Sequence, residues 1–397
     1  MFTPPVSLAD LWPAGTVSSA RPDDDAVDWL SRSRGWRERA SAVPLIMAGG
    51  LPVLCHEAGA TPAALQFLRE CGLSVTSQVL TFNGEGARPA VARLAADGHL
   101  IGVTYAPRRL AAPREAYVTD PEVFASLNDK ADLGDLLPPG AVPAREVVHP
   151  DRLEEALARR AGSLPLVLKA GTRLGSGSGR DVAVCRTPGD LDAARRKLAG
   201  ADRFVIEEYC GFATTWCLHY AAGESGVTYC GATEQICDAE GVYQGNWCEQ
   251  GRGPAGEAVD LGRYAAIAGW VRGYRGFLGI DVGQAADGRW LAFDPNFRTN
   301  GSTMQALLGA GLADAWGTGC TRLRYGIGFD GSFEEMLDRL HAFHRRRELV
   351  PILVFDTPQL GLTDEDGAPT CGIVATGADR TAVEAVFGRL REAGFRC

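Results

Sequence analysis

Lysine is nearly missing from this 397-residue chain, because only three of its 40 basic residues are lysine. The three are Lys130, Lys169 and Lys197, and arginine supplies all the others. Such a bias is typical of a GC-rich genome and by itself indicates no function. A lysine that remains is nevertheless of interest where arginine is a poor substitute for a compact ammonium group, for example beneath a phosphate. Lys197 lies on a polar predicted helix beside Arg195 and Arg196, so only Lys130 and Lys169 are candidates for such a role.

Long apolar runs are missing as well. No run approaches the roughly 18–20 residues needed to cross a bilayer. The polar start, Met1–Asp10, contains proline and lacks the charged region of a signal peptide. The formal net charge is −9, whereas proteins that coat nucleic acid normally carry a basic face. We therefore expect a cytoplasmic protein that binds neither membranes nor nucleic acid.

Closely spaced cysteine pairs are also absent. The eleven cysteines are spread from Cys55 to Cys397, and none forms a CxxC pair. A zinc site normally needs such pairs or converging histidines, and the six histidines are scattered. We interpret the cysteines as reduced thiols that pack as small hydrophobic side chains.

The first 125 residues alternate predicted strands with predicted helices, which indicates a parallel sheet. The clearest helix start is Thr61-Pro62, because proline is favoured at the first position of a helix. In order, we expect a helix at Asp25–Ala40, strands at Val43–Met47 and Leu51–His56, a helix at Thr61–Cys71, a strand at Leu73–Phe82, a helix at Gly86–Asp97 and a strand at His99–Tyr105.

A glycine-serine loop follows a predicted apolar strand that carries Lys169. A P-loop would end in Gly-Lys-Ser/Thr, and a dinucleotide fingerprint would open a helix. Residues 180–185 instead alternate as a strand, so we expect the loop to join two antiparallel strands. Its backbone N–H groups could close over phosphates, although a surface hairpin without a ligand is an open alternative. A lysine on an apolar strand favours the phosphate interpretation, because burying it is costly unless it meets an anion. The loop residues are Gly175, Ser176, Gly177, Ser178 and Gly179.

A second group of residues lies on a predicted hairpin that closes at Asp287-Gly288, a strong two-residue turn. That turn pairs Asp281 with Asp294, and the two-residue strand period puts Asn296 and Arg298 on the face of Asp294. Facing carboxylates destabilise a sheet unless a cation lies between them. Two carboxylates and an amide oxygen are suitable ligands for Mg²⁺. An exposed acidic hairpin is the alternative, but the flanking apolar residues favour a packed sheet.

In this order, these features resemble the ATP-grasp superfamily over roughly residues 120–320. The resemblance implies an ATP-grasp fold, of mixed α/β and α+β class, with a Rossmann-like pre-ATP-grasp domain before it. It also implies ATP and Mg²⁺ as cofactors. By the family pattern, Lys130, Lys169 and the glycine loop contact the ATP phosphates, and Arg298 steadies an acyl phosphate. The adenine would lie along Glu207, Glu208, Tyr209 and Cys210, and the Mg²⁺ ligands would be Asp281, Asp294 and Asn296.

The resemblance also has a gap, because many members carry an acid for the ribose where this chain has Thr214 and Thr215. The overall look is similar to pheganomycin-type peptide ligases. The division it suggests is a pre-ATP-grasp domain at 1–120, an ATP-grasp domain at 121–348 and a small βαβ-like tail at 349–397.

The implied activity is a carboxylate–amine ligase. ATP would convert a carboxylate to an acyl phosphate, and an amine would attack it to form an amide or peptide bond in a biosynthetic reaction. An ATP-dependent phosphotransferase and a non-catalytic nucleotide-binding protein remain as alternatives, whereas the loop argues against a nicotinamide oxidoreductase. We expect amino acid or peptide substrates and, as oligomeric state, a homodimer. Two stretches flank the proposed site and should determine the substrate, Glu234–Trp247 and Asn300–Thr303, although either could instead be ordinary strand ends and loop. Their candidate substrate contacts are Glu234, Asn246, Asn300 and Ser302.

Overall fold

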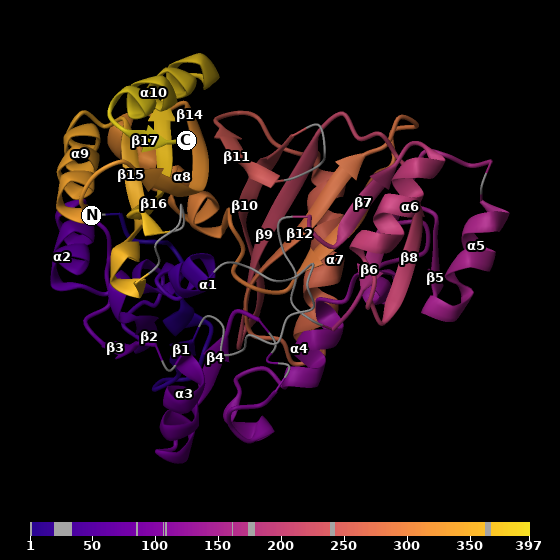
Figure 1. Cartoon of the computed structure of the whole chain (residues 1–397), viewed down its shortest axis with the longest axis horizontal. Helices are drawn as coiled ribbons and strands as arrows, with labels where there is room; N and C mark the ends of the chain where they lie inside the picture. The colour runs from indigo at the N-terminus through magenta and orange to yellow at the C-terminus, as the bar shows by residue number, and fades with distance from the viewer. Residues whose placement is uncertain are drawn as a thin grey trace.

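The computed structural model of the chain describes residues 2–19, 34–84, 86–105, 107, 109–160, 162–173, 179–238, 243–361 and 367–397. These residues form three sheets, which lie in a row with helices packed around them (Figure 1). A four-stranded parallel sheet holds the N-terminal elements, a nine-stranded sheet runs through the middle, and a four-stranded antiparallel sheet lies at the other end.

The N-terminal sheet has the order β3-β2-β1-β4 and is parallel throughout, as the alternation of strands and helices predicts. The predicted helix start is confirmed, because the Thr61 hydroxyl accepts a hydrogen bond from the Ala64 amide and caps α2. The elements are β1 (Val17–Ser19), α1 (Arg34–Ala40), β2 (Val53–His56), α2 (Pro62–Glu70), β3 (Val79–Phe82), α3 (Ala87–Ala96) and β4 (Ile101–Val103).

In this region one predicted element is wrong, and another lies partly outside the described residues. The predicted strand at Val43–Met47 is wrong, since a 3₁₀ helix spans Val43–Ile46 there. Pro44 lies at its first turn, where its fixed φ suits a helix and its missing N–H would interrupt a strand ladder. The predicted helix at Asp25–Ala40 is seen only as α1, because residues 25–33 lie outside the described part of the chain.

The small antiparallel sheet has the order β5-β8-β6-β7 and is covered by α5 and α6. Strands β6 and β7 pair directly, so the glycine-serine loop joins antiparallel strands as expected. Of that loop only Gly179 is described; 175–178 lie outside the described residues. The elements that lead into and form this lobe are α4 (Pro121–Leu127), the 3₁₀ helix η6 (Lys130–Leu136), β5 (Arg145–Val148), α5 (Leu153–Arg159), β6 (Leu166–Gly171), β7 (Val182–Cys185), α6 (Pro188–Lys197) and β8 (Arg203–Glu208).

The nine-stranded sheet has the order β13-β12-β9-β10-β11-β14-β16-β15, with β17 paired to β14. Strands β16 and β17 lie antiparallel to β14, so with α10 they form a βαβ unit around it. The elements are β9 (Thr215–Gly223), β10 (Gly226–Cys237), β11 (Tyr243–Glu249), α7 (Gly256–Val271), β12 (Gly276–Gln284), β13 (Trp290–Asn296), α8 (Thr303–Trp316), β14 (Cys320–Phe329), α9 (Phe333–Arg345), β15 (Leu349–Phe355), β16 (Thr370–Gly377), α10 (Arg380–Glu392) and β17 (Phe395–Arg396).

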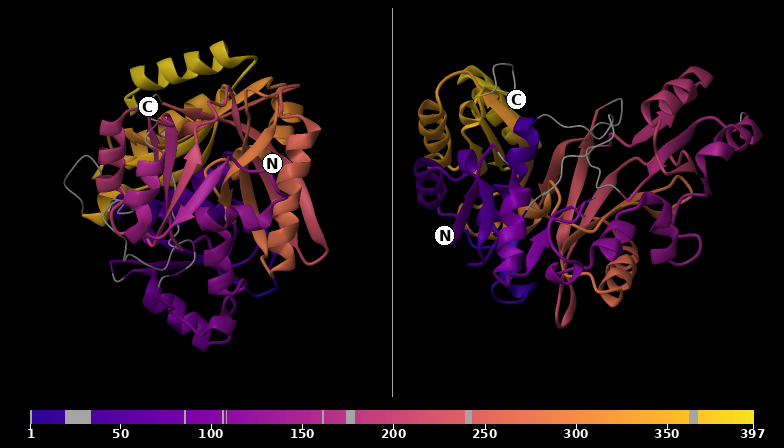
Figure 2. Two further views of the ribbon diagram at one scale, coloured as in Figure 1. Left: turned by 90° about the vertical axis from the view of Figure 1, so that its right-hand side faces the viewer. Right: turned by 60° about the horizontal axis from the view of Figure 1, so that its bottom comes forward.

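The two ends of the chain share one hydrophobic core. Leu45 and Phe67 of the N-terminal region belong to the same buried cluster as Val354, Phe355 and Leu390 near the C-terminus. The right-hand view of Figure 2 shows the N-terminal and C-terminal elements side by side, at the end of the molecule away from α5 and α6. The predicted regions 1–120 and 349–397 therefore share one core. The division of the chain into domains stays a prediction.

The hairpin of β12 and β13 has the predicted pair but not the predicted turn. The turn is a three-residue loop, in which the Ala285 amide donates to Arg289 O and Gly288 takes a φ of 88°. A bulge at Phe293 then shifts the ladder by one residue, and this second shift restores the pairing of Asp281 with Asp294.

All eleven cysteines are free in the structure, and most of them are buried or half-buried, as expected for thiols that pack as small hydrophobic side chains. None of the helices in the described part of the chain combines the length and hydropathy that a bilayer crossing requires.

Candidate active site

One cavity of about 460 Å³ gathers residues from all three sheets. The small lobe contributes Lys169 from β6, the central sheet contributes the β12–β13 hairpin, and the N-terminal sheet contributes Thr104 and Tyr105 just after β4. The residues predicted from the sequence that line it are Lys130, Lys169, Gly179, Asn246, Asp281, Asp294, Asn296, Arg298, Asn300 and Ser302.

Lys130 lies at the start of η6, which Asp129 caps by accepting a hydrogen bond from the Ala131 amide. Its Nζ is buried and pairs with Asp181 at 3.1 Å and with Asp294. Burial alone would lower the pKa of Lys130, but the charges of Asp181 and Asp294 outweigh burial and raise it. The ammonium group of Lys130 therefore stays charged although it is buried.

Lys169 is only 4% exposed and points from β6 toward the hairpin. Its Nζ donates to Phe293 O at 2.8 Å and pairs with Glu207 on the neighbouring strand β8. Glu207 also meets Arg145, whose Nη2 lies 3.4 Å from Oε1. Each cavity lysine thus has a carboxylate partner that an incoming phosphate could replace.

The facing carboxylates lie on the floor of the cavity. Burial raises the pKa of Asp281 to about 7, and the charge of Asp294 adds to the shift. Gln235 donates to Asp281 Oδ2 at 2.8 Å, while Asp281 Oδ1 is buried without a hydrogen-bond partner among the described residues. Such an orphaned carboxylate oxygen is costly unless a cation meets it.

These residues fit a hard divalent cation. The amide of Asn296 lies 3.4 Å from Asp281 Oδ2 and 3.3 Å from Asp294 Oδ2. Rotating that amide would present its oxygen to the same point. Two carboxylates and one amide oxygen then form the oxygen donor set that Mg²⁺ prefers.

A neutral polar network lines the wall beyond the carboxylates. His219 Nε2 lies 3.1 Å from Ser302 Oγ and 3.2 Å from Thr233 Oγ1, and Asn246 donates to Thr233 Oγ1 at 3.0 Å. Burial lowers the pKa of His219 to about 3, so the ring is neutral. Asn300 completes this wall by donating to Cys217 Sγ at 3.2 Å.

Several predicted residues lie away from the cavity. Glu234 faces the other side of β10, where Arg252 and Arg380 bind its carboxylate, so the structure does not bring it to the site. The reason is the strand period, because the next residue, Gln235, takes the cavity side. The residues Glu208, Tyr209 and Cys210 follow Glu207 at the end of β8 and do not line the cavity.

The segment after β8 nevertheless approaches the cavity. Phe212 stacks on Phe293 with ring centroids 5.3 Å apart, and Phe293 lines the cavity. The backbone of Glu208 is tied to β5, because its amide donates to Ala144 O at 2.9 Å. The predicted adenine segment, which ends at Cys210, therefore lies close to the cavity wall at Phe293.

Sequence reasoning missed several residues of the lining. Asp181 is buried beside Lys130, and only its position next to the glycine loop pointed to it. The other missed residues come from distant parts of the chain and have no local motif: Arg39, Tyr105, Cys217, Arg324 and Tyr325. Gln235 and Tyr243 also line the cavity, and both lie within the stretch 234–247 that was expected to flank the site.

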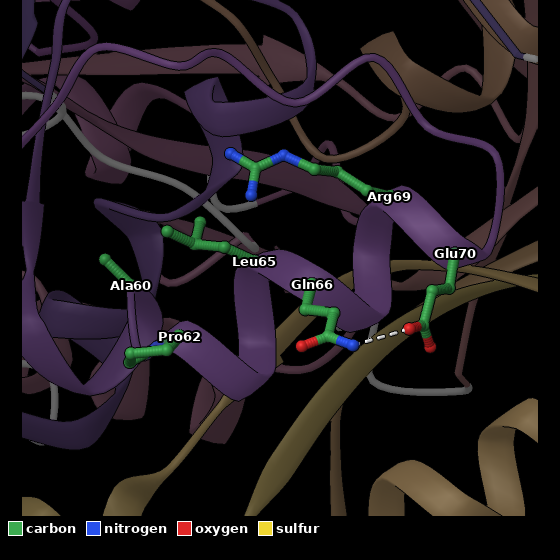
Figure 3. A pocket seen from close by; sticks show the side chains of 6 residues that line it. All are labelled: Ala60, Pro62, Leu65, Gln66, Arg69 and Glu70. Carbon is green, nitrogen blue, oxygen red and sulfur yellow. Dashed lines mark hydrogen bonds between the residues drawn. The ribbon is translucent and has the colours of Figure 1, made fainter.

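A separate hollow lies on α2 and contains no candidate site residue (Figure 3). Its lining comes from residues 60–70, and its polar side chains have partners: Gln66 donates to Glu70 at 2.7 Å, and Arg69 donates to Thr76 O at 3.3 Å. This hollow is formed by α2 and the residues just before it, so it brings together no charged groups from distant parts of the chain.

Two family models match the chain. Residues 143–296 match the model described as "L-aspartate--L-methionine ligase, ATP grasp". Residues 7–125 match the model described as "L-aspartate--L-methionine ligase N-terminal domain". The two matches together span the N-terminal sheet and, except for Lys130, the predicted nucleotide-binding residues.

The fold also has relatives among solved structures. An ADP complex of purK, N5-carboxyaminoimidazole ribonucleotide synthetase, superimposes with a TM-score of 0.59 at 14% identity, covering 97% of this chain and 98% of that one. The Staphylococcus aureus enzyme with ADP gives 0.61 at 10% identity, covering 97% and 98%. The Thermus thermophilus enzyme gives 0.57 at 18% identity, covering 96% and 98%. At these identities the likeness shows the fold, which is the predicted ATP-grasp fold.

Proposed function

The chain belongs to the ATP-grasp family of ATP-dependent carboxylate–amine ligases, and from that premise we propose which of its residues activate the carboxylate and which substrates it joins. One observation carries the proposal. Two lysines, two facing carboxylates, an amide and an arginine line a single cavity: Lys130, Lys169, Asp281, Asp294, Asn296 and Arg298.

The two lysines hold the phosphates of ATP. Both are buried and both pair with carboxylates, so they are charged and aimed before the nucleotide arrives. A phosphate that enters the cavity exchanges one anionic partner for another, which keeps the ammonium groups compensated throughout. Gly179 lines the same cavity, and by the family pattern we assign the backbone N–H groups of residues 175–179 to the phosphates.

The hairpin holds Mg²⁺ through Asp281, Asp294 and Asn296. When bound, the cation neutralises charge on the transferring phosphoryl group. The buried Oδ1 of Asp281 supports this assignment, because it has no hydrogen-bond partner of normal geometry among the described residues, and the nearby Cys217 thiol is only a weak donor.

The reaction then runs in two displacements. A carboxylate oxygen of the first substrate attacks the γ-phosphorus, ADP leaves, and an acyl phosphate forms. The amine of the second substrate attacks the carbonyl carbon, loses a proton, and expels inorganic phosphate. Arg298 is 8% exposed and lines the cavity beside the hairpin, where its guanidinium group stabilises the anionic acyl phosphate.

The base of ATP lies along the end of β8. Glu207 and the backbone of Glu208, Tyr209 and Cys210 border the adenine, because this strand end adjoins the cavity through Phe212 and Phe293. The ribose is held by groups other than a nearby acid, since Thr214 and Thr215 stand at the usual position.

We infer that the substrates are two amino acids, L-aspartate and L-methionine, on the strength of the family models. Both leave a carboxylate unreacted, and the cavity is lined by Arg39 and Arg324 as well as Arg298. Asn246, Asn300 and Ser302 form the neutral wall that we assign to amino acid recognition.

The test is a product assay. The protein, ATP and Mg²⁺ are incubated with L-aspartate and L-methionine together, with each alone, and with other amino acid pairs. We expect ADP, phosphate and the Asp–Met dipeptide in equal amounts only when both are present. A different productive pair would replace the substrate assignment, and ADP release without any amine would instead favour a phosphotransferase.

The remaining expectations belong to the same proposal. A cytoplasmic homodimer with domains at 1–120, 121–348 and 349–397 is consistent with a small-molecule ligase, and the likeness to pheganomycin-type ligases stays a prediction.

A further inference from the structure

Arg298 is held between elements from two distant parts of the chain. On its own side, Phe297 is fully buried and packs edge-to-face on Tyr274, with centroids 5.2 Å apart. On the other side, Thr299 Oγ1 lies 3.8 Å from Met47 Sδ, which belongs to the N-terminal region. The backbone that carries the arginine is therefore fixed at both neighbours.

The guanidinium group itself lies over an aromatic ring. Its Cζ is 5.1 Å from the centroid of the Tyr105 ring. Tyr105 follows β4 of the N-terminal sheet by two residues, and both side chains line the same cavity. An aromatic ring attracts a guanidinium face that rests on it, so the contact holds the plane of the group in one orientation.

We propose that Tyr105 is a positioning residue for Arg298, so that the N-terminal sheet forms part of the site where the acyl phosphate is made. This inference rests on the proposed function, because it gives Arg298 an oriented edge toward that intermediate. It assigns the N-terminal region a direct part in the reaction through one named contact, in addition to its part in the shared core.

The ring, rather than the hydroxyl, carries this role. A cation over an aromatic face at a mostly buried site contributes a free energy that corresponds to a change of about 5- to 30-fold in rate. ATP is held elsewhere, at Lys130 and Lys169, so losing the ring should leave ATP affinity nearly unchanged. A partial loss of folded protein would also lower the apparent kcat without changing the KM for ATP, so circular dichroism of each variant checks that the fold is intact.

The experiment compares Tyr105→Leu with Tyr105→Phe in the full-length protein, with steady-state kinetics on a productive amino acid pair. Tyr264→Leu is the matched control, since that tyrosine is 61% exposed on α7 and lies outside the cavity. We expect Tyr105→Leu to lower kcat by about 5- to 30-fold with the KM for ATP within about twofold. Tyr105→Phe and Tyr264→Leu should stay within about threefold of wild type.

A cycle with Arg298→Lys tests the coupling. Lysine lacks the planar face, so Tyr105→Leu should cost less in that background than in wild type. The inference is overturned if Tyr105→Leu keeps wild-type kcat, if Tyr105→Phe falls as far as Tyr105→Leu, or if the two losses simply multiply. These results would leave the proposed function standing. Failure of wild-type protein to release phosphate with any amino acid pair would overturn the function and the inference together.

Discussion

Asp281 and Asp294 face each other across the β12–β13 ladder, at the floor of a cavity that also contains Lys130 and Lys169. Asp294 is neutralised by Lys130, whereas one oxygen of Asp281 is buried and has no hydrogen-bond partner of normal geometry in the part of the chain that the structure describes. The arrangement is unfavourable for the sheet alone. A cation bound between the two carboxylates would remove this repulsion.

The first prediction separates stability from activity at this pair. Asp281→Asn replaces a buried carboxyl group with a neutral amide. Burial and the charge of Asp294 raise the pKa of that carboxyl group, so its ionised form is unfavourable in the folded protein. In Mg²⁺-free buffer at pH 8 we expect the substitution to stabilise the fold by about 1 kcal/mol, measured as a higher unfolding midpoint. The same change should lower kcat at least about 100-fold, because a metal ligand is lost.

Asp287→Asn is the control for that variant, since Asp287 lies on the exposed turn of the same hairpin and pairs with neighbouring Arg289. It should change neither the midpoint nor the turnover noticeably. An Asp281→Asn protein that is both destabilised and active would show that the pair is an ordinary structural feature.

The second prediction uses the scarcity of lysine. Lys169→Ala should lower ATP-dependent turnover by at least about 100-fold while the fold remains intact, because a preorganised phosphate contact is removed. Lys197→Ala is the matched control: Lys197 lies on α6 and donates to Val182 O at 2.9 Å. Circular dichroism checks the fold and phosphate release checks turnover. Near-wild-type activity of Lys169→Ala would remove this lysine from the site.

The third prediction concerns the amino acid wall. A Cβ on Gly279 would lie 2.2 Å from Asn300 Nδ2 and 2.7 Å from Cys217 Sγ, so Gly279→Ala must displace the Asn300 side chain. We expect the KM for an amino acid substrate to rise several-fold, while the KM for ATP changes little. Gly256→Ala, at the open start of α7, would meet none of the described residues within 4 Å and should behave as wild type. A rise in the KM for ATP alone would contradict the assignment of the Asn300 wall to amino acid recognition.

The fourth prediction is a pH dependence of stability. The pKa of His219 is about 3 in the folded protein, because the ring is buried, against about 6.5 when unfolded. Between these values only the unfolded chain takes up the proton. The contribution of His219 is therefore complete above about pH 6.5 and falls toward pH 3, by up to about 1.4 kcal/mol per pH unit.

His219→Gln should accordingly flatten the loss of unfolding free energy between pH 7 and pH 4, as followed by urea unfolding. His149→Gln replaces a histidine whose side chain is 66% exposed and serves as the comparison. Parallel pH curves for wild type and His219→Gln would contradict the burial argument.

The local features were the predictable ones. Thr61-Pro62 begins a helix because a cap and a proline act within one turn, and the glycine loop joins antiparallel strands as its flanking alternation indicates. The Asp281–Asp294 pair was also predicted, although by a two-residue turn that does not exist. A longer turn and the bulge at Phe293 shift the register in opposite directions and cancel.

The features that depend on tertiary packing were not predictable. Glu234 was expected near the substrate, but Arg380 from the distant helix α10 binds it on the opposite face of β10. Tyr105 and Arg39 reach the cavity only because the N-terminal region packs onto the central sheet. No local pattern marks such residues, since their neighbours in space are far away in sequence: Glu234 and Arg380 are 146 positions apart.

The most direct test of the account is an isotope transfer. A carboxylate substrate labelled with ¹⁸O in both oxygens is turned over with ATP, Mg²⁺ and the amine, and the released phosphate is analysed by mass spectrometry. Activation as an acyl phosphate predicts one ¹⁸O atom in each phosphate, one retained in the amide carbonyl, and ADP as the nucleotide product. Phosphate without ¹⁸O, or release of AMP and pyrophosphate, would contradict carboxylate activation at this site.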